Sequence, residues 1–126
     1  MTQKEMKART KKHCLQIIFY LRKLPKSDET VLIGKQLMRS STSIAANYMA
    51  ACRAKSAADF THKIKIVEEE ADETCFWMEL LIELYGNSPE AESLLKESSE
   101  LTAIFYGNRP NNQGKCRKQK LRYFTI

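Results

Sequence analysis

The sequence contains few of the residues that interrupt helices, with only four glycines and three prolines. A fold rich in tight turns, such as a β-sandwich, needs more of both. No apolar run approaches the ~20 residues of a membrane helix. The charged start, MTQKEMKARTKKHC, also lacks the apolar segment of a signal peptide. These absences favour a helical protein that we expect to be cytoplasmic, with no membrane contact.

The sequence also lacks the motifs of common catalytic and metal sites. The four cysteines form no C-x-x-C pair and lie far apart, at Cys14, Cys52, Cys75 and Cys116, whereas zinc sites need close ligand pairs. A di-metal site in a helical bundle needs two Glu-x-x-His motifs, and the only acid-x-x-His pair here is Asp59 with His62. No glycine-rich phosphate loop, G-x-S-x-G or H-E-x-x-H motif occurs. We therefore expect no enzyme, no metal and no cofactor.

The clearest pattern that is present is a heptad-type seam over residues 56–86. Its members are spaced alternately four and three residues apart: Phe60, Ile64, Val67, Ala71, Thr74, Met78, Leu81 and Tyr85. This spacing predicts one long helix that buries a single stripe against partners. A second stripe beside it includes Glu70, Glu73 and Trp77.

Three further helices are predicted, at residues 3–24, at 28–54, and from Pro89 to a stop at residues 107–110. The first has an expected apolar stripe of Cys14, Ile17, Ile18, Leu21 and Leu24. Ser27 or Asp28, Ser56 and Ser88 are candidate N-caps. Short joints between long helices predict antiparallel neighbours. We therefore predict an all-α, up-down-up-down four-helix bundle over residues 1–108, followed by a basic, disordered tail at 109–126.

Charge is unevenly distributed along the chain, whose net charge is +6. Residues 1–66 hold 14 Lys/Arg and 4 Asp/Glu, residues 67–100 hold 1 and 11, and residues 101–126 hold 6 and none. Such a chain either presents a basic face to phosphates or pairs its opposite charges between subunits. The candidate nucleic-acid-binding residues are Lys7, Arg9, Lys11, Lys12, Lys115, Arg117, Lys118, Lys120 and Arg122. A solvated, frayed first helix and a merely soluble tail are the alternatives.

Two polar segments interrupt the apolar pattern. The second helix becomes small and polar between Ser40 and Asn47, which indicates either a close helix contact or a polar site at a helix–helix seam. The third helix holds five acids between Glu68 and Glu73. So many carboxylates must be solvated or paired, and a catalytic carboxylate pair is the alternative.

Three linked blocks resemble a known family. They are RSSTSIAAN (residues 39–47), SAADF (56–60) and EADETCFWMELL (70–81). Together they resemble the proteins encoded by intervening sequences of bacterial 23S ribosomal RNA genes, also called the S23 family, over about residues 5–106. The chain departs from the family at Ala50, where the family has an acid, and at Phe76, where it has tyrosine.

The resemblance implies a four-helix bundle that forms a homopentamer, and by analogy the binding of structured RNA or DNA. It also suggests an alternative, a protein-interaction scaffold such as an accessory subunit of a reverse transcriptase. The family match falls on one set of residues that predicts an inter-helix or subunit polar contact: Arg39, Ser43, Asn47, Glu70, Glu73 and Trp77.

Overall fold

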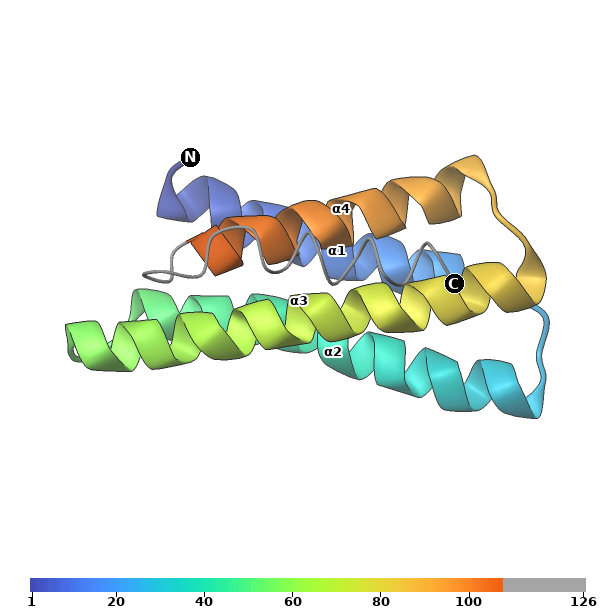
Figure 1. Cartoon of the computed structure of the whole chain (residues 1–126), viewed down its shortest axis with the longest axis horizontal. Helices are drawn as coiled ribbons and strands as arrows, with labels where there is room; N and C mark the ends of the chain where they lie inside the picture. Colours follow the sequence, from blue (N-terminus) through green and yellow to red (C-terminus); the bar gives the residue numbers. More distant parts are fainter. Residues whose placement is uncertain (108–126) are drawn as a thin grey trace.

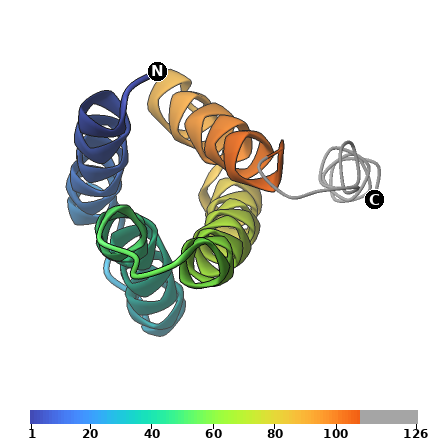
Figure 2. The ribbon, with the colours of Figure 1, turned by 90° about the vertical axis from the view of Figure 1, so that its left-hand side faces the viewer.

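The computed structural model describes residues 1–107, which form four helices joined by short turns. The helices are α1 (Gln3–Arg22), α2 (Asp28–Cys52), α3 (Ala57–Tyr85) and α4 (Pro89–Gly107). They run alternately up and down (Figure 1), and the end view in Figure 2 shows them at the corners of a square. Contacts join α1 to α2, α2 to α3, α3 to α4 and α4 to α1. The predicted all-α, up-down-up-down bundle is confirmed.

Serine side chains begin three of the helices. The hydroxyl oxygens of Ser27, Ser56 and Ser88 accept the amide N–H three residues later, at 3.1, 3.0 and 3.1 Å. These bonds satisfy amides that have no partner inside the helix. Asp59 reaches back to the amide of Lys55, at 3.2 Å, and fixes the α2–α3 joint. Gly86 ends α3 with φ of +90°, a conformation that favours glycine.

The core consists of two apolar clusters separated by a polar belt. One cluster surrounds Ile17, Leu37, Met78 and Leu81, and the other surrounds Ile44, Val67, Leu101 and Phe105. Between them lies the polar belt, which we define as the buried residues Thr10, His13, Ser40, Ser41, Thr74, Ser98 and Thr102. Most of these hydroxyls donate to a carbonyl of the preceding turn, so their burial leaves few unsatisfied groups.

The predicted stripe of the first helix is only partly correct. The buried residues of α1 are Met6, Thr10, His13, Ile17 and Tyr20. Of the five predicted residues, only Ile17 belongs to this set. The other four are partly exposed, and two of them, Leu21 and Leu24, pack against the core cluster that contains Ile17. The buried residues of α1 alternate four and three residues apart, as in the seam of α3. Two of them, Thr10 and His13, are polar, so a pattern of apolar side chains does not reveal this stripe.

The predicted seam of α3 is buried from Ile64 to Leu81 and fails at its ends. Phe60 is 37% exposed, although its position in the seam predicts burial. Figure 1 shows the reason, because α3 starts beyond the ends of α1 and α4, so that α2 is its one neighbour there among the helices of residues 1–107. At the other end, the half-buried Tyr85 hydroxyl hydrogen-bonds to Ser27, at 2.9 Å, and to Thr30.

Candidate functional site

Four of the six residues predicted to make a polar contact form one cluster between α2 and α3: Arg39, Glu70, Glu73 and Trp77. The Arg39 guanidinium binds Glu70 at 3.0 Å and also binds Glu73. The Trp77 indole N–H donates to the same Glu73 carboxylate at 3.1 Å. Trp77 stacks edge-on against Phe76, with 4.9 Å between ring centroids. The pairing is therefore made inside one chain, by residues one turn apart on α3 and one arginine on α2.

Electrostatics in this cluster follow from the shared arginine. The hydrogen bond from Arg39 to Glu73 is the main cause that raises the pKa of Arg39 above its ordinary value. Burial raises the pKa of Glu70 and the charge of Arg39 opposes this effect. Within residues 1–107, neither carboxylate hydrogen-bonds a histidine, cysteine or serine side chain that could complete an acid–base pair. The arrangement is that of an inter-helix ion pair.

The other two residues of the predicted contact lie apart from the cluster. The Asn47 side chain donates to the Ser43 carbonyl at 2.9 Å, one turn earlier on the same helix. The buried hydrogen bond between α2 and α3 is made by a different pair. The Thr74 hydroxyl of α3 donates to the Ser40 hydroxyl oxygen of α2 at 2.8 Å. Ser40 and Thr74 lie in two of the sequence blocks that predicted a polar contact between these helices. Nothing in the sequence indicated that these two hydroxyls bond to each other.

A second polar contact, between α1 and α4, was not anticipated from the sequence. The Arg9 guanidinium makes two bonds of 2.7 Å to Glu97 and one of 3.0 Å to Glu100. Burial opposes ionisation of Glu97, but the bond and charge of Arg9 outweigh it, so the pKa of Glu97 falls below its usual value. Arg9 was predicted to bind nucleic acid, and in the structure it holds α1 to α4.

His13 lies one turn farther along the same seam and is 1% exposed. Its Nε2 is 2.9 Å from the Ser98 hydroxyl oxygen. Burial lowers the pKa of His13 from 6.5 to about 4, so the imidazole is neutral at pH 7. It therefore acts as a hydrogen-bonding member of the polar belt.

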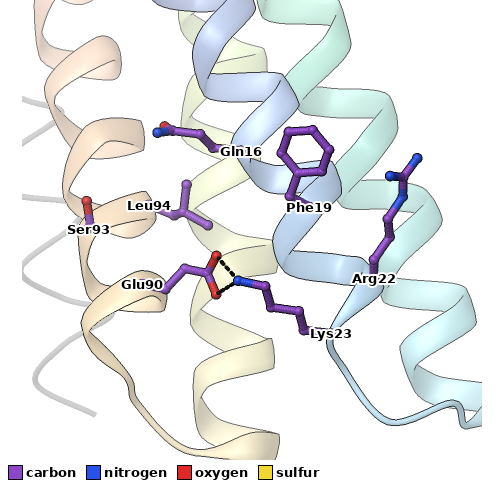
Figure 3. A pocket seen from close by; sticks show the side chains of 7 residues that line it. All are labelled: Gln16, Phe19, Arg22, Lys23, Glu90, Ser93 and Leu94. Atoms are coloured by element: carbon purple, nitrogen blue, oxygen red, sulfur yellow. Dashed lines mark hydrogen bonds and ion pairs between the residues drawn. The ribbon is translucent and has the colours of Figure 1, made fainter.

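The surface between α1 and α4 is hollowed beside these contacts. A groove of about 590 Å³ is lined by Gln16, Phe19, Arg22, Lys23, Glu90, Ser93 and Leu94. Figure 3 shows Lys23 reaching across this groove from α1 to Glu90 on α4, at 3.0 and 3.2 Å. Leu94 contributes an apolar side chain and Phe19 lies at the rim. A second open groove follows along the same seam, past Arg9 and Lys12.

The remaining predicted basic residues of α1 are exposed at one end of the bundle. Lys7, Lys11 and Lys12 form no ion pair within residues 1–107. The α2–α3 joint lies at the same end (Figure 2) and brings Arg53 and Lys55, which were not among the predicted residues. The predicted tail residues fall outside the described part of the chain: Lys115, Arg117, Lys118, Lys120 and Arg122.

Residues 1–107 contain neither a metal-binding cluster nor a membrane span. No group of three or more His, Cys, Asp or Glu side chains there could hold a metal ion. In the same part of the chain, no helix combines the length and the apolar character that crossing a membrane requires.

These features define an all-α protein of the up-down-up-down four-helix bundle class, held by ion pairs between its helices. The chain belongs to the 23S rRNA-intervening sequence protein family, whose model matches residues 3–107. The family predicted from the three sequence blocks is thereby confirmed.

Comparison with known proteins supports the fold as well as the family. The chain is similar to a crystal structure described as a protein with unknown function from the S23 ribosomal protein family of Bacteroides thetaiotaomicron. The two are 32% identical, the match covers 80% of this chain and 94% of the other, and the TM-score is 0.72. No curated protein matches the chain. Neither comparison indicates an enzymatic activity.

Proposed function

We propose that this protein is a non-enzymatic helical bundle that binds structured RNA or DNA through its basic end. We define the basic end as the start of α1 together with the α2–α3 joint, residues 1–12 and 49–66. These segments lie far apart in the sequence but at the same end of the bundle (Figure 1). Together they hold nine Lys/Arg and two Asp/Glu. This concentration of cations is the observation that carries the proposal.

The exposed cations of the basic end suit phosphate contacts. Lys4, Lys7 and Lys11 are three and four residues apart, so they follow one stripe of α1. All three are exposed, as are Arg53 and Lys55 across the end of the bundle. Arg9 is left out of the proposed surface, because binding a phosphate would require it to leave Glu97 and Glu100. The tail cations would add to this surface.

A salt titration tests the proposal. Fluorescence anisotropy should show binding of a labelled RNA hairpin at micromolar protein. If four cations contact phosphates, the slope of log K against log salt is about −3.6, which is a roughly 150-fold loss between 50 and 200 mM salt. Lys7→Gln with Lys11→Gln should reduce the slope by about 2.

A matched pair at the opposite end serves as the control. Lys26→Gln with Lys35→Gln removes the same charge from exposed positions beyond α1 and on α2. This control should leave the slope unchanged. A duplex DNA of equal length, titrated in parallel, distinguishes RNA from nucleic acid in general. Absence of salt-sensitive binding, or an equal effect of both charge pairs, would contradict the proposal.

Exposed apolar side chains favour a second function, that of a protein-interaction scaffold. Val31 and Met38 are 53% and 38% exposed on one stripe of α2, and Leu15 and Phe19 on α1 are 43% and 50% exposed. Gly34, between Val31 and Met38, lies against Leu21 of α1, which places the α2 stripe beside that helix. Apolar surface shared by neighbouring helices is typical of an association site. In this second function the chain would bind a second copy of itself, or would be an accessory subunit of a reverse transcriptase or another partner.

A further inference from the structure

Phe60 is the one phenyl ring of the basic end, and it is exposed. The segments 1–12 and 49–66 contain no other phenylalanine, and no tyrosine or tryptophan. Phe60 is 37% exposed and belongs to neither core cluster. Ile64, one turn later on the same stripe of α3, is 2% exposed and lies in the cluster that contains Val67. The ring of Phe60 therefore lies at the boundary of the core, where a ligand can reach it.

The helix around Phe60 leaves room for a flat ligand. A side chain on an α-helix leans toward the preceding turn, and for Phe60 this turn holds Ser56 and Ala57. Both residues are small and exposed, so this turn offers no bulky side chain to cover the ring. The start of α3 also extends past the ends of α1 and α4, as Figure 1 shows. Among the helices of residues 1–107, α2 alone flanks the ring there.

Cations accompany this ring, and the carboxylate next to it in the sequence is already paired. Arg53 and Lys55 precede Phe60 in the α2–α3 joint, and both are exposed. Asp59 accepts hydrogen bonds from the Lys63 ammonium at 2.6 Å and from the Lys55 amide at 3.2 Å. The N-terminal ends of α1 and α3, which carry partial positive charge, also lie at this end of the bundle. The surroundings of the ring therefore favour a ligand that is both aromatic and anionic.

We infer that Phe60 stacks on an unpaired base of the nucleic acid that the basic end binds. Every nucleobase has a flat π-face that can stack on an aromatic side chain. Bases inside a duplex are covered by their neighbours, whereas bases in loops and single-stranded extensions are available for stacking. The phosphates beside the stacked base contact Arg53 and Lys55. This inference rests on the proposed function and adds the class of ligand, which is a nucleic acid with unpaired nucleotides.

Two RNAs that differ only in their unpaired nucleotides test the inference. One is a blunt duplex, and the other is the same duplex with about six unpaired nucleotides at one end. Phe60→Leu keeps an apolar side chain and removes the aromatic face. Stacking of one base strengthens binding by a factor of roughly 5 to 150. Fluorescence anisotropy should therefore show that this variant binds the extended RNA at least ~5-fold more weakly than the wild type. Its affinity for the blunt duplex should be unchanged.

Two further variants separate stacking from a general loss of apolar surface. Phe60→Trp keeps an aromatic face and should bind the extended RNA at least as tightly as the wild type. Phe76→Leu removes a phenyl ring with the same exposed fraction from the middle of α3, and it should change neither affinity. Equal losses for Phe60→Leu and Phe76→Leu, or an equal loss for both RNAs, would overturn the inference.

A photochemical crosslink locates the stacked base directly. 5-Iodouridine in the unpaired extension should become joined to the segment 56–63, which mass spectrometry of the digested complex identifies. Crosslinks confined to other segments would overturn the inference. If both RNAs bind and Phe60→Leu changes neither affinity, stacking on Phe60 is wrong and the phosphate contacts of the proposed function still stand. If neither RNA binds at micromolar protein, the proposed function is wrong and the inference fails with it.

Discussion

At the scale of single residues, His13 ties the stability of the fold to pH. The Ser98 hydroxyl donates to the Leu94 carbonyl at 2.8 Å, so its oxygen accepts the N–H of His13 Nε2. The Nδ1 lone pair is buried and has no hydrogen-bond partner within residues 1–107. Protonation would place an N–H there without an acceptor, which is costly in a buried site.

Acidification should therefore destabilise the protein through His13. The unfolded chain binds the proton with the ordinary pKa of 6.5 and the folded chain with a pKa of about 4. The contribution of His13 to the free energy of unfolding is then fully present above pH 6.5. It decreases as the pH falls from 6.5 to about 4, and it is constant below that pH. Burial dominates this shift, with Glu97 favouring the charged form and Arg9 opposing it.

Urea unfolding at pH 7 and pH 4.5 measures this loss. The His13→Leu variant keeps the approximate side-chain volume and removes the titration. Between pH 7 and pH 4.5, the free energy of unfolding should fall by about 2.5 kcal/mol more in the wild type than in this variant. The exposed His62 is present in both proteins and serves as an internal control. Equal losses in the two proteins would show that His13 does not set the pH dependence.

The sequence predicts which residues share a face when they lie close together on the same helix. The positions of Glu70, Glu73 and Trp77 on one stripe follow from helical spacing alone. The contact between Arg9 and Glu97 joins residues that are 88 positions apart. Nothing local in either helix distinguishes these two charges from their neighbours, so their pairing required the three-dimensional arrangement.

At the scale of helices, the four contacts of the bundle are unequal. α2 and α3 share the most extensive contact, and α1 and α4 share the smallest. The existence and order of the helices could be predicted, because proline, glycine and capping residues mark their ends. The core face of α1 could not be predicted in full, because Thr10 and His13 occupy positions at which apolar residues are expected.

The unequal contacts predict unequal protection from hydrogen exchange. Amides of α1 should exchange faster than those of α3, since few contacts must break to release α1. Arg9→Met should accelerate exchange in α1 and in the end of α4, and leave α2 and α3 unchanged. Hydrogen exchange with mass spectrometry gives both comparisons. Equal protection of α1 and α3 in the wild type would contradict this view of the bundle.

At the scale of the whole molecule, the two proposed kinds of association, with nucleic acid and with protein, use different parts of the surface. The basic end concentrates charge, whereas six of the ten exposed large apolar residues within residues 1–107 lie along α1 and α2. The family resemblance predicted a homopentamer, and assembly through this apolar surface is consistent with that prediction. Neither association could be derived from helix patterns, because exposed positions on a helix are defined only after its core face is known.

Light scattering tests the assembly. A pentamer has five times the mass of the 14.6 kDa chain. Leu15→Asp with Phe19→Asp should shift the protein to the mass of one chain, because charge on an apolar contact is costly to desolvate. Leu84→Asp, at an exposed apolar position of α3, should leave the mass unchanged. A wild type of 14.6 kDa at tens of micromolar would exclude the pentamer.

The polar belt described above also restricts how the helices can slide past one another. A uniform apolar core tolerates a shift of one heptad, because each side chain finds an equivalent neighbour. Here such a shift would move Ser40 away from Thr74, and His13 away from Ser98, into purely apolar surroundings. Only one vertical alignment of the four helices pairs these groups, so the belt encodes the register of the bundle.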